Sequence, residues 1–294
     1  MHSVNSGEGR GHLAALFTIL VWGTTYISTK VLLRDFKPVE ILMIRFVIGY
    51  GVLWLMYPHR IRYRNMREES TFLAAGFFGV TLYYLLENIA LQYTLASNIG
   101  VLITVAPFFT ALLSKIFRLR GEKTTVWFYV GFIISMTGLC LLSFGSSGVE
   151  LHFLGDLLGL CAALSWSVYS VLSKKITSFG YSTAGATRRI FAYGTLFMIP
   201  AMAVFRFNPP LEKLRDPVIL INILYLGIIA SAICFAVWNL AVRLIGVVKT
   251  SVYIYLTPVV TVVSSVLILK EKITLAAGIG IVMTLAGLIL SDRK

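Results

Sequence analysis

The chain has 294 residues, of which 57% are hydrophobic and 13% charged, and its formal net charge is +13. A soluble domain carries roughly 25% charged residues, so this composition excludes an aqueous surface of normal size and indicates an integral membrane protein. The basic residues lie mostly in short segments between apolar runs, so the positive-inside preference accounts for them and nucleic-acid binding is not predicted.

Ten apolar segments have the length of about 20 residues that a membrane-spanning helix needs. In chain order they are expected near residues 12–32, 39–57, 71–91, 97–117, 124–143, 153–173, 183–205, 217–239, 247–268 and 274–291. The connections are short, so we predict an all-α bundle without a separate soluble domain. Lys and Arg in the early loops favour a multi-pass protein of the cell membrane with both termini in the cytoplasm.

The two halves of the chain repeat one another in sparse but ordered positions. Residues 22–30 recur 144 positions later at 166–174, and Arg45 matches Arg189 in the same register. Further matches, at offsets of 151 and 149, are Asn88 with Asn239, Pro107 with Pro258, Ser114 with Ser265, Glu122 with Glu271, Gly131 with Gly280 and Gly138 with Gly287. With five helices each, residues 1–145 and 146–294 are expected to be inverted repeats, the plan of a secondary transporter.

Two opposite charges, Arg45 and Glu87, lie at equal depth in the second and third segments. At about 1.5 Å per residue, both are roughly 8–10 Å below the outer surface. An ionised side chain near the bilayer centre costs about 2.5–3.5 kcal/mol, so each needs a partner or water. We predict an Arg45–Glu87 ion pair that either binds substrate and gates a cavity or locks two helices together; snorkelling to the interface is the third interpretation. Glu87 is also the only well-buried acid that we expect to be available for proton coupling.

Arg189 differs from its repeat partner Arg45, because Trp238 stands where an acid would match Glu87. We therefore expect no acidic partner for Arg189. It either attracts an anionic substrate group and gates the pathway, or anchors its helix on the cytoplasmic side beside Arg188.

The other candidate residues are polar or aromatic side chains inside apolar segments. Asn88 and Asn239 either bind substrate or join helices by hydrogen bonds. Pro107 and Pro258 each remove a backbone hydrogen bond and are either hinges or fixed kinks. The aromatic candidates for a substrate-binding wall, with ordinary packing or interfacial placement as the alternative, are Trp22, Tyr26, Tyr83, Trp166, Tyr169, Trp238 and Tyr253.

Other patterns predict packing or exclude a function. Glycines spaced by seven residues in the fifth and tenth segments predict close helix contact. The three cysteines all lie in apolar segments, and the four histidines lie in the N-terminal tail, loops or helix ends, so neither a disulfide framework nor a metal site is predicted. The sequence shows no P-loop, HExxH or GxSxG motif, and we expect no cofactor.

Several motifs of the chain point to a known family. These are the WGTTYISTK segment, the stretch from Asn88 to Ser114, and Gly121-Glu122-Lys123 with its counterpart Lys270-Glu271-Lys272. In these motifs the chain resembles an EamA-type member of the drug/metabolite transporter superfamily. The resemblance covers essentially the whole chain. It implies ten helices in two inverted five-helix repeats and transport, often export, of amino acids or related small metabolites. It fixes neither the substrate nor the site residues.

These patterns predict a secondary transporter that moves a small organic metabolite, favoured to be an amino acid or similar zwitterion, outward by alternating access. Arg45 would meet a carboxylate and Glu87 an amine. The alternatives are a multidrug-type exporter of apolar or cationic compounds and a non-transporting membrane scaffold. An integral membrane enzyme acting on lipid or a lipid-linked sugar is not predicted, because it would need clustered Asp, Glu or His at one interface and the sequence shows no such cluster. The expected partners are the substrate and the bilayer, in a monomer or homodimer.

Overall fold

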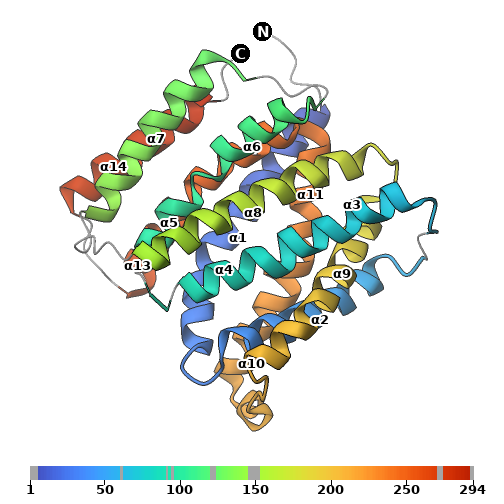
Figure 1. Ribbon diagram of the computed structural model, residues 1–294. Coiled ribbons are helices and arrows are strands. Elements are labelled where there is room, and N and C mark those ends of the chain that lie inside the picture. Colours follow the sequence, from blue (N-terminus) through green and yellow to red (C-terminus); the bar gives the residue numbers. More distant parts are fainter. Residues whose placement is uncertain are drawn as a thin grey trace.

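The computed structural model describes residues 6–59, 62–90, 92–93, 96–119, 124–144, 153–269 and 274–291, and every regular element in them is helical (Figure 1). The first half contains α1 (Ser6–Leu32), α2 (Pro38–Met56), α3 (Met66–Gly76), the π-helix η1 (Phe77–Leu82), α4 (Tyr83–Ala90), α5 (Ala96–Ile103), α6 (Ala106–Ile116) and α7 (Val126–Phe144). The second half contains α8 (Phe153–Thr177), α9 (Thr183–Val204), the 3₁₀ turn η2 (Leu211–Arg215), α10 (Pro217–Leu224), the π-helix η3 (Tyr225–Ile233), α11 (Cys234–Ile245), α12 (Val247–Val252), the 3₁₀ turn η4 (Tyr253–Tyr255), α13 (Leu256–Leu269) and α14 (Leu275–Ser291).

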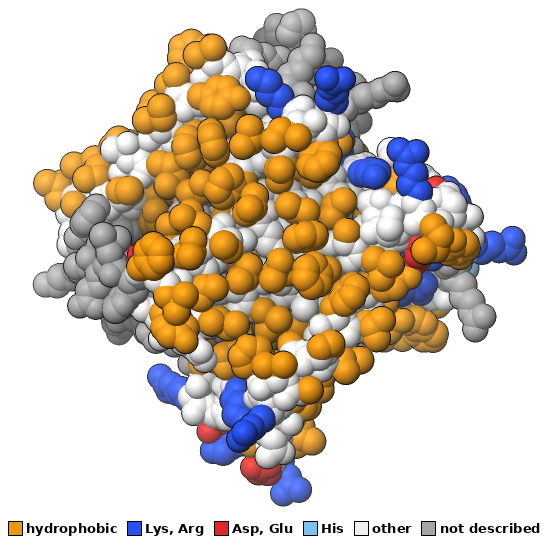
Figure 2. Space-filling view, viewed as in Figure 1, with side chains coloured by type: hydrophobic (Ala, Val, Ile, Leu, Met, Phe, Trp, Pro, Cys, Tyr) orange, Lys and Arg blue, Asp and Glu red, His pale blue; other side chains and the backbone are white. Residues whose placement is uncertain are grey.

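The membrane-embedded character expected from the composition is confirmed. Figure 2 shows a broad apolar band that separates Lys and Arg side chains at the bottom from those at the right and top. Six helical stretches are long and apolar enough to cross a membrane, and three shorter apolar helices accompany them. The six are Gly7–Thr29, Pro38–Met56, Met66–Ala90, Ile99–Ile116, Phe153–Thr177 and Pro217–Ile245.

Two of the expected helices are broken in the same place, next to the matched prolines. The segment predicted at 97–117 divides into α5 and α6 at Thr104 and Val105, and Pro107 lies in the first turn of α6. The segment predicted at 247–268 divides at η4, and Pro258 lies in the first turn of α13. Proline is tolerated there because the first helical turn has no partners for its backbone N–H groups.

The two π-helices also occupy matching positions. Shifting η1 by 151 residues superimposes it on residues 228–233, which lie within η3. A π-helical turn leaves the regular hydrogen-bond pattern and often marks a functional site. In the described part of each half, a π-helical segment and a broken helix therefore place irregular backbone inside the bundle.

The repeat-related helices α2 and α9 run antiparallel. At the start of α2, the Lys37 ammonium donates to the carbonyl of Arg206, just beyond α9. At the other end, the Arg188 guanidinium near the start of α9 donates to the carbonyls of Tyr57 and His59. A helix of 19 residues is about 28 Å long, so these contacts lie at opposite ends of the bundle. We name them the Asp35 end and the Arg64 end, after residues in the neighbouring loops.

The last helices of the two halves, α7 and α14, pack along each other at the side of the bundle (Figure 1). A Cβ atom on Gly131 would lie 2.4 Å from the carbonyl oxygen of Gly287, and one on Gly138 would lie 2.7 Å from that of Gly280. No side chain fits at these distances, so the predicted role of the four glycines in close helix contact is confirmed.

Candidate substrate-binding cavity

A buried cavity of about 70 Å³ lies in the middle of the bundle. Six of the residues proposed from the sequence line it, namely Trp22, Arg45, Tyr83, Glu87, Asn88 and Trp166. Six more were not proposed, namely Thr25, Thr29, Tyr84, Ile103, Ile254 and Thr257. Asn88 also borders a more open hollow of about 460 Å³ at the Asp35 end, which Arg34, Asp35 and Lys37 line as well. The cavity therefore lies close to the Asp35 end.

Arg45 reaches the cavity from α2 and is held in place by its neighbours. Its side chain is buried, and its Nε donates a hydrogen bond of 2.9 Å to Ser231 Oγ in η3. Its guanidinium carbon lies 4.8 Å from the centre of the Tyr84 ring, a cation–π contact. Close packing of α2 on η3, where a Cβ on Gly49 would lie 3.2 Å from the Gly227 carbonyl, brings Ser231 within reach.

Glu87 lines the same cavity from α4, and the hydroxyl of Tyr83 donates to its Oε1 at 3.1 Å. The predicted ion pair with Arg45 is not formed: among the described residues, no Glu87 oxygen lies within 4.0 Å of the Arg45 guanidinium nitrogens. The helices instead place two opposite charges on one cavity wall. Both side chains therefore line the same space.

Glu87 is not the only well-buried acid, contrary to our expectation, because Glu40 and Glu69 are buried as well. Glu40 lies in the first turn of α2, and its carboxylate accepts hydrogen bonds from the backbone N–H groups of Lys37 and Asn208. Glu69 lies in α3 and contacts Arg189 and Tyr193 of α9, so packing of one helix against another buries it.

An aromatic cluster forms the floor of the cavity. The rings of Trp22 and Trp166 meet edge to face with centroids 5.2 Å apart, and Trp238 lies 5.2 Å from Trp22. Tyr83 and Tyr169 lie on either side of Trp166, each with ring centroids 5.0 Å away. Such contacts are worth about 0.5–1.5 kcal/mol per pair beyond area burial. Trp22 and Trp166 thus line the cavity, whereas Tyr169 and Trp238 close it from below.

Asn239 lies beyond this floor, towards the Arg64 end, and connects three helices. Its Oδ1 accepts hydrogen bonds from Tyr169 Oη at 2.9 Å and Ser173 Oγ at 2.6 Å, both in α8. Its Nδ2 donates to Thr187 Oγ1 in α9 at 3.0 Å. The helix-joining interpretation of this asparagine is therefore the one that the contacts support. A small hollow of about 20 Å³ adjoins it.

Arg189 has an acidic partner after all, which corrects the expectation drawn from the repeat. Its Nη2 lies 2.7 Å from Glu69 Oε2 of α3, and Tyr193 donates to the other oxygen of the same carboxylate. The Arg189 guanidinium also lies over the Phe72 ring. The repeat comparison missed Glu69 because this acid lies in the first turn of α3, just before the predicted third segment, and not at the position that matches Glu87.

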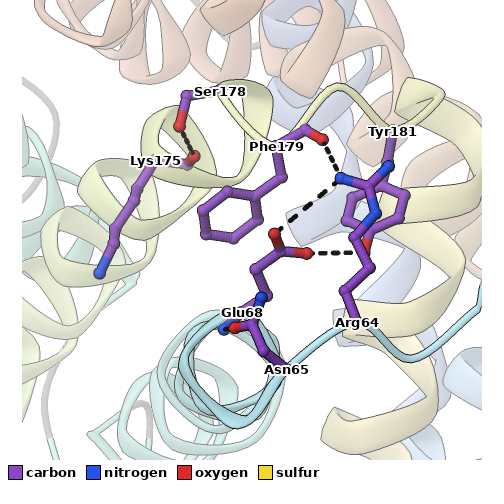
Figure 3. Close-up of polar contacts among 7 residues, drawn as sticks. All are labelled: Arg64, Asn65, Glu68, Lys175, Ser178, Phe179 and Tyr181. Carbon is purple, nitrogen blue, oxygen red and sulfur yellow. Dashed lines mark hydrogen bonds and ion pairs between the residues drawn. The ribbon is translucent and has the colours of Figure 1, made fainter.

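A second group of contacts closes the loops at the Arg64 end (Figure 3). Arg64 donates to the carbonyl of Phe179 at 2.8 Å and lies over the Tyr181 ring. The Tyr181 hydroxyl donates to Glu68 at 2.7 Å. Partial burial and then this hydrogen bond raise the pKa of Tyr181 above its ordinary value. The loop before α3 and the loop before α9 are thereby joined.

The remaining predicted residues either lie away from the cavity or fall outside the part of the chain that the structure describes. Tyr253 lies in η4 and its hydroxyl makes a hydrogen bond of 2.8 Å with His12 Nδ1. Pro107 and Pro258 lie at the helix breaks. The Tyr26 side chain, Glu122, Glu271, the Ser265 side chain and the Gly145–Gly148 linker lie outside the described residues.

Thr25 and Thr29 line the cavity but were not predicted, although the sequence contains a signal that could have identified them. Both belong to the repeated segment that begins at Trp22, three and seven residues beyond that tryptophan, so they share its helix face. Short hydroxyl side chains are common in packed apolar helices, so their presence alone does not predict a cavity.

Fold and cavity together define a helical membrane protein with a buried, charged central site. A model of the EamA-like transporter family matches the chain twice, at residues 9–144 and 153–291. The chain belongs to this family of membrane transporters, and the resemblance that its motifs suggested is confirmed.

The chain is similar over nearly its whole length to several transporters. It is 30% identical to an uncharacterized transporter of Archaeoglobus fulgidus, over 98% of this chain and 99% of that protein. It is 25% identical to a protein of Streptantibioticus cattleyicolor named as a probable terminal-alkyne amino-acid exporter, over 96% and 93%. A crystal structure with 20% sequence identity superimposes with a TM-score of 0.79 over 96% of both chains, which shows a shared fold.

Proposed function

We propose that this chain is a secondary transporter that moves an amino acid or a related zwitterion out of the cell by alternating access. The observation that carries the proposal is the placement of two opposite charges, Arg45 and Glu87, on the wall of one buried cavity. A carboxylate fits the Arg45 guanidinium, and an ammonium group fits Glu87.

The aromatic wall supports the same class of substrate. Four aromatic side chains line the cavity together with Arg45 and Glu87, namely Trp22, Tyr83, Tyr84 and Trp166. They offer an apolar surface to the uncharged part of a solute. The relative named as an amino-acid exporter is consistent with this chemistry.

The proposed topology has ten membrane-spanning helices in two inverted repeats, residues 1–145 and 146–294. The antiparallel α2 and α9 and the paired irregular segments support it. Basic side chains near the Arg64 end, including Arg67, Arg188 and Lys174, favour placing that end and both termini in the cytoplasm of a cell-membrane protein. The cavity near the Asp35 end then corresponds to an outward-facing state.

The test is a screen of solutes by thermal shift, followed by counterflow in proteoliposomes. A ligand raises the melting temperature by mass action, and the panel contains zwitterions, the matching carboxylates without an amine, and the matching amines without a carboxylate. We expect the zwitterion to stabilise most. Arg45→Ala and Glu87→Gln should each reduce counterflow by at least about tenfold, the effect of losing one charge-assisted hydrogen bond.

Lys213→Gln is the matched control, because it removes a charge from an exposed ion pair with Asp35. It should leave counterflow unchanged. Equal counterflow in Arg45→Ala, Glu87→Gln and the parent protein contradicts the site. Stabilisation by apolar amines that does not depend on Arg45 would favour a multidrug-type exporter, and transport of no solute in the panel would favour a scaffold.

A further inference from the structure

The asparagines Asn88 and Asn239 are repeat partners in different surroundings. Asn239 joins α11 to α8 and α9 through three buried hydrogen bonds. The side chain of Asn88, among the contacts of the described residues, makes one hydrogen bond of 2.8 Å, to the carbonyl of Tyr84 in its own helix. One asparagine thus holds helices together, and its partner does not.

Asn88 lies where the central cavity meets the space at the Asp35 end. It lines the cavity, and it also lines two hollows that Lys37, Pro38 and Gln92 border. Its side chain therefore lies between the cavity and the hollows at that end. Asn239, at the matching position of the other half, lines the small hollow of about 20 Å³ described above.

The partners of Asn239 have their own counterparts in the first half. With the offset of 144, Tyr169 corresponds to Thr25 and Ser173 to Thr29. Both threonines line the same cavity as Asn88 and carry a hydroxyl that can donate a hydrogen bond. Closing the cavity would bring α1 to α4, as α8 now lies against α11.

We infer that Asn88 and Asn239 are reciprocal latches of the transport cycle. In the present state Asn239 closes the Arg64 end through Tyr169, Ser173 and Thr187. In the opposite state that latch is broken, and Asn88 closes the Asp35 end by accepting hydrogen bonds from Thr25 and Thr29. The inference rests on the alternating access proposed above, but it concerns the gates and not the substrate.

A pair of tryptophans supports the exchange independently. The indole N–H of Trp22 donates to the carbonyl of Ala230 in η3 at 3.0 Å. The indole N–H of its partner Trp166 is buried and has no acceptor among the described residues. The carbonyl that matches Ala230 at the offset of 151 belongs to Gly79 in η1, against which Tyr169 already packs. If the two halves exchanged conformations, the indole N–H of Trp166 would gain the Gly79 carbonyl as an acceptor. The indole N–H of Trp22 would then lose its hydrogen bond to Ala230.

The experiment measures which end of the purified protein is open, using the reaction rate of single cysteines with a maleimide. In a background in which Cys140, Cys161 and Cys234 are replaced, Thr257→Cys reports on the cavity and Ala186→Cys reports on the hollow beside Asn239. Without further changes, Thr257→Cys should react quickly and Ala186→Cys slowly. No substrate is needed, and the orientation in a membrane does not matter.

Asn239→Ala and Asn88→Ala are the matched pair of variants. Loss of the Asn239 latch should raise the labelling rate of Ala186→Cys on the order of tenfold and lower that of Thr257→Cys, because three hydrogen bonds that favour the present state are lost. Asn88→Ala should change both rates in the opposite direction or leave that of Ala186→Cys at its low starting value. Labelling that moves in the same direction in both variants overturns the inference.

Ser173→Ala and Thr29→Ala repeat the comparison with smaller changes, in case Asn239→Ala does not fold. Ser173→Ala should act like Asn239→Ala at about a threefold level, and Thr29→Ala should act like Asn88→Ala. A folded Ser173→Ala protein with unchanged Ala186→Cys labelling contradicts the latch. If labelling follows the expectation and zwitterion counterflow fails, the latch stands and the substrate assignment is wrong; the reverse result leaves the substrate site intact and removes the latch.

Discussion

The Asp35 end and the Arg64 end of this protein are built from matching residues but make different contacts. At the Arg64 end, Asn239 ties three helices together and the space beside it is nearly closed. At the Asp35 end, the matching Asn88 stands at the mouth of the cavity. The difference teaches that a duplicated sequence can hold two conformations at once, one in each half, and that their contrast shows how the gates work.

The two ends also differ in how their charges are paired. The Arg189–Glu69 pair is largely buried, with side-chain exposures of 15% and 10%. The Lys213–Asp35 pair at the other end is 51% and 28% exposed. The hydrogen bond between Lys213 and Asp35 raises the pKa of Lys213. Solvent exposure and salt screening nevertheless keep the contribution of this ion pair to stability small. The Arg64 end is therefore the one fastened by electrostatics.

The largest expected effect tests this electrostatic contrast. Arg189→Ala leaves the Glu69 carboxylate largely buried without its partner, so we expect a loss of about 3 kcal/mol in the free energy of unfolding. Lys213→Ala should have a much smaller effect, because that ion pair is exposed to solvent and screened by salt. Unfolding of the detergent-solubilised protein, followed by intrinsic fluorescence, measures both. Similar losses in the two variants would show that the ends are fastened equally.

The pair α7 and α14 provides a symmetric reference for the asymmetric gates. A Cβ on Gly131 would lie 2.4 Å from the Gly287 carbonyl oxygen, and one on Gly287 would lie 2.5 Å from that of Gly131. Gly131→Ala and Gly287→Ala should therefore each cost about 2 kcal/mol, equally, because helices must move apart. Thermal unfolding measures the cost.

Gly278→Ala is the control for these two variants, because the same helix has open space at that position. It should be neutral or slightly stabilising, since alanine favours a helix over glycine. Clearly unequal costs at Gly131 and Gly287 would show that the asymmetry between the halves extends to this pair.

The smallest expected effect concerns the two tryptophans. Trp22→Phe removes the donor to Ala230 and should destabilise the present state by about 1 kcal/mol, whereas Trp166→Phe removes an N–H group without a described acceptor and should cost less. The difference between the two melting temperatures measures the contrast, because both substitutions remove a similar part of the aromatic cluster. A larger loss for Trp166→Phe would contradict the asymmetry of the pair.

Much of the cavity could be predicted from the sequence, because rare residues in an apolar chain are informative. Five residues were predicted because they are costly to bury in a membrane or recur in the repeat, and the structure places all of them on one cavity. They are Trp22, Arg45, Glu87, Asn88 and Trp166. The sequence failed where partners come from elsewhere in the chain. Nothing local connects Glu69 to Arg189, and charges at equal depth did not prove to be in contact.

The sequence by itself determined that this is a duplicated, membrane-embedded helical transporter, because hydropathy, repeat register and helix breakers are local properties of the chain. Only the tertiary structure decided which half is open. Asn88 and Asn239 occupy matching positions of the two repeats, so these positions cannot by themselves distinguish a latch from a cavity mouth. That choice depends on how α1 and α8 pack against their neighbours, and packing is a property of the whole bundle.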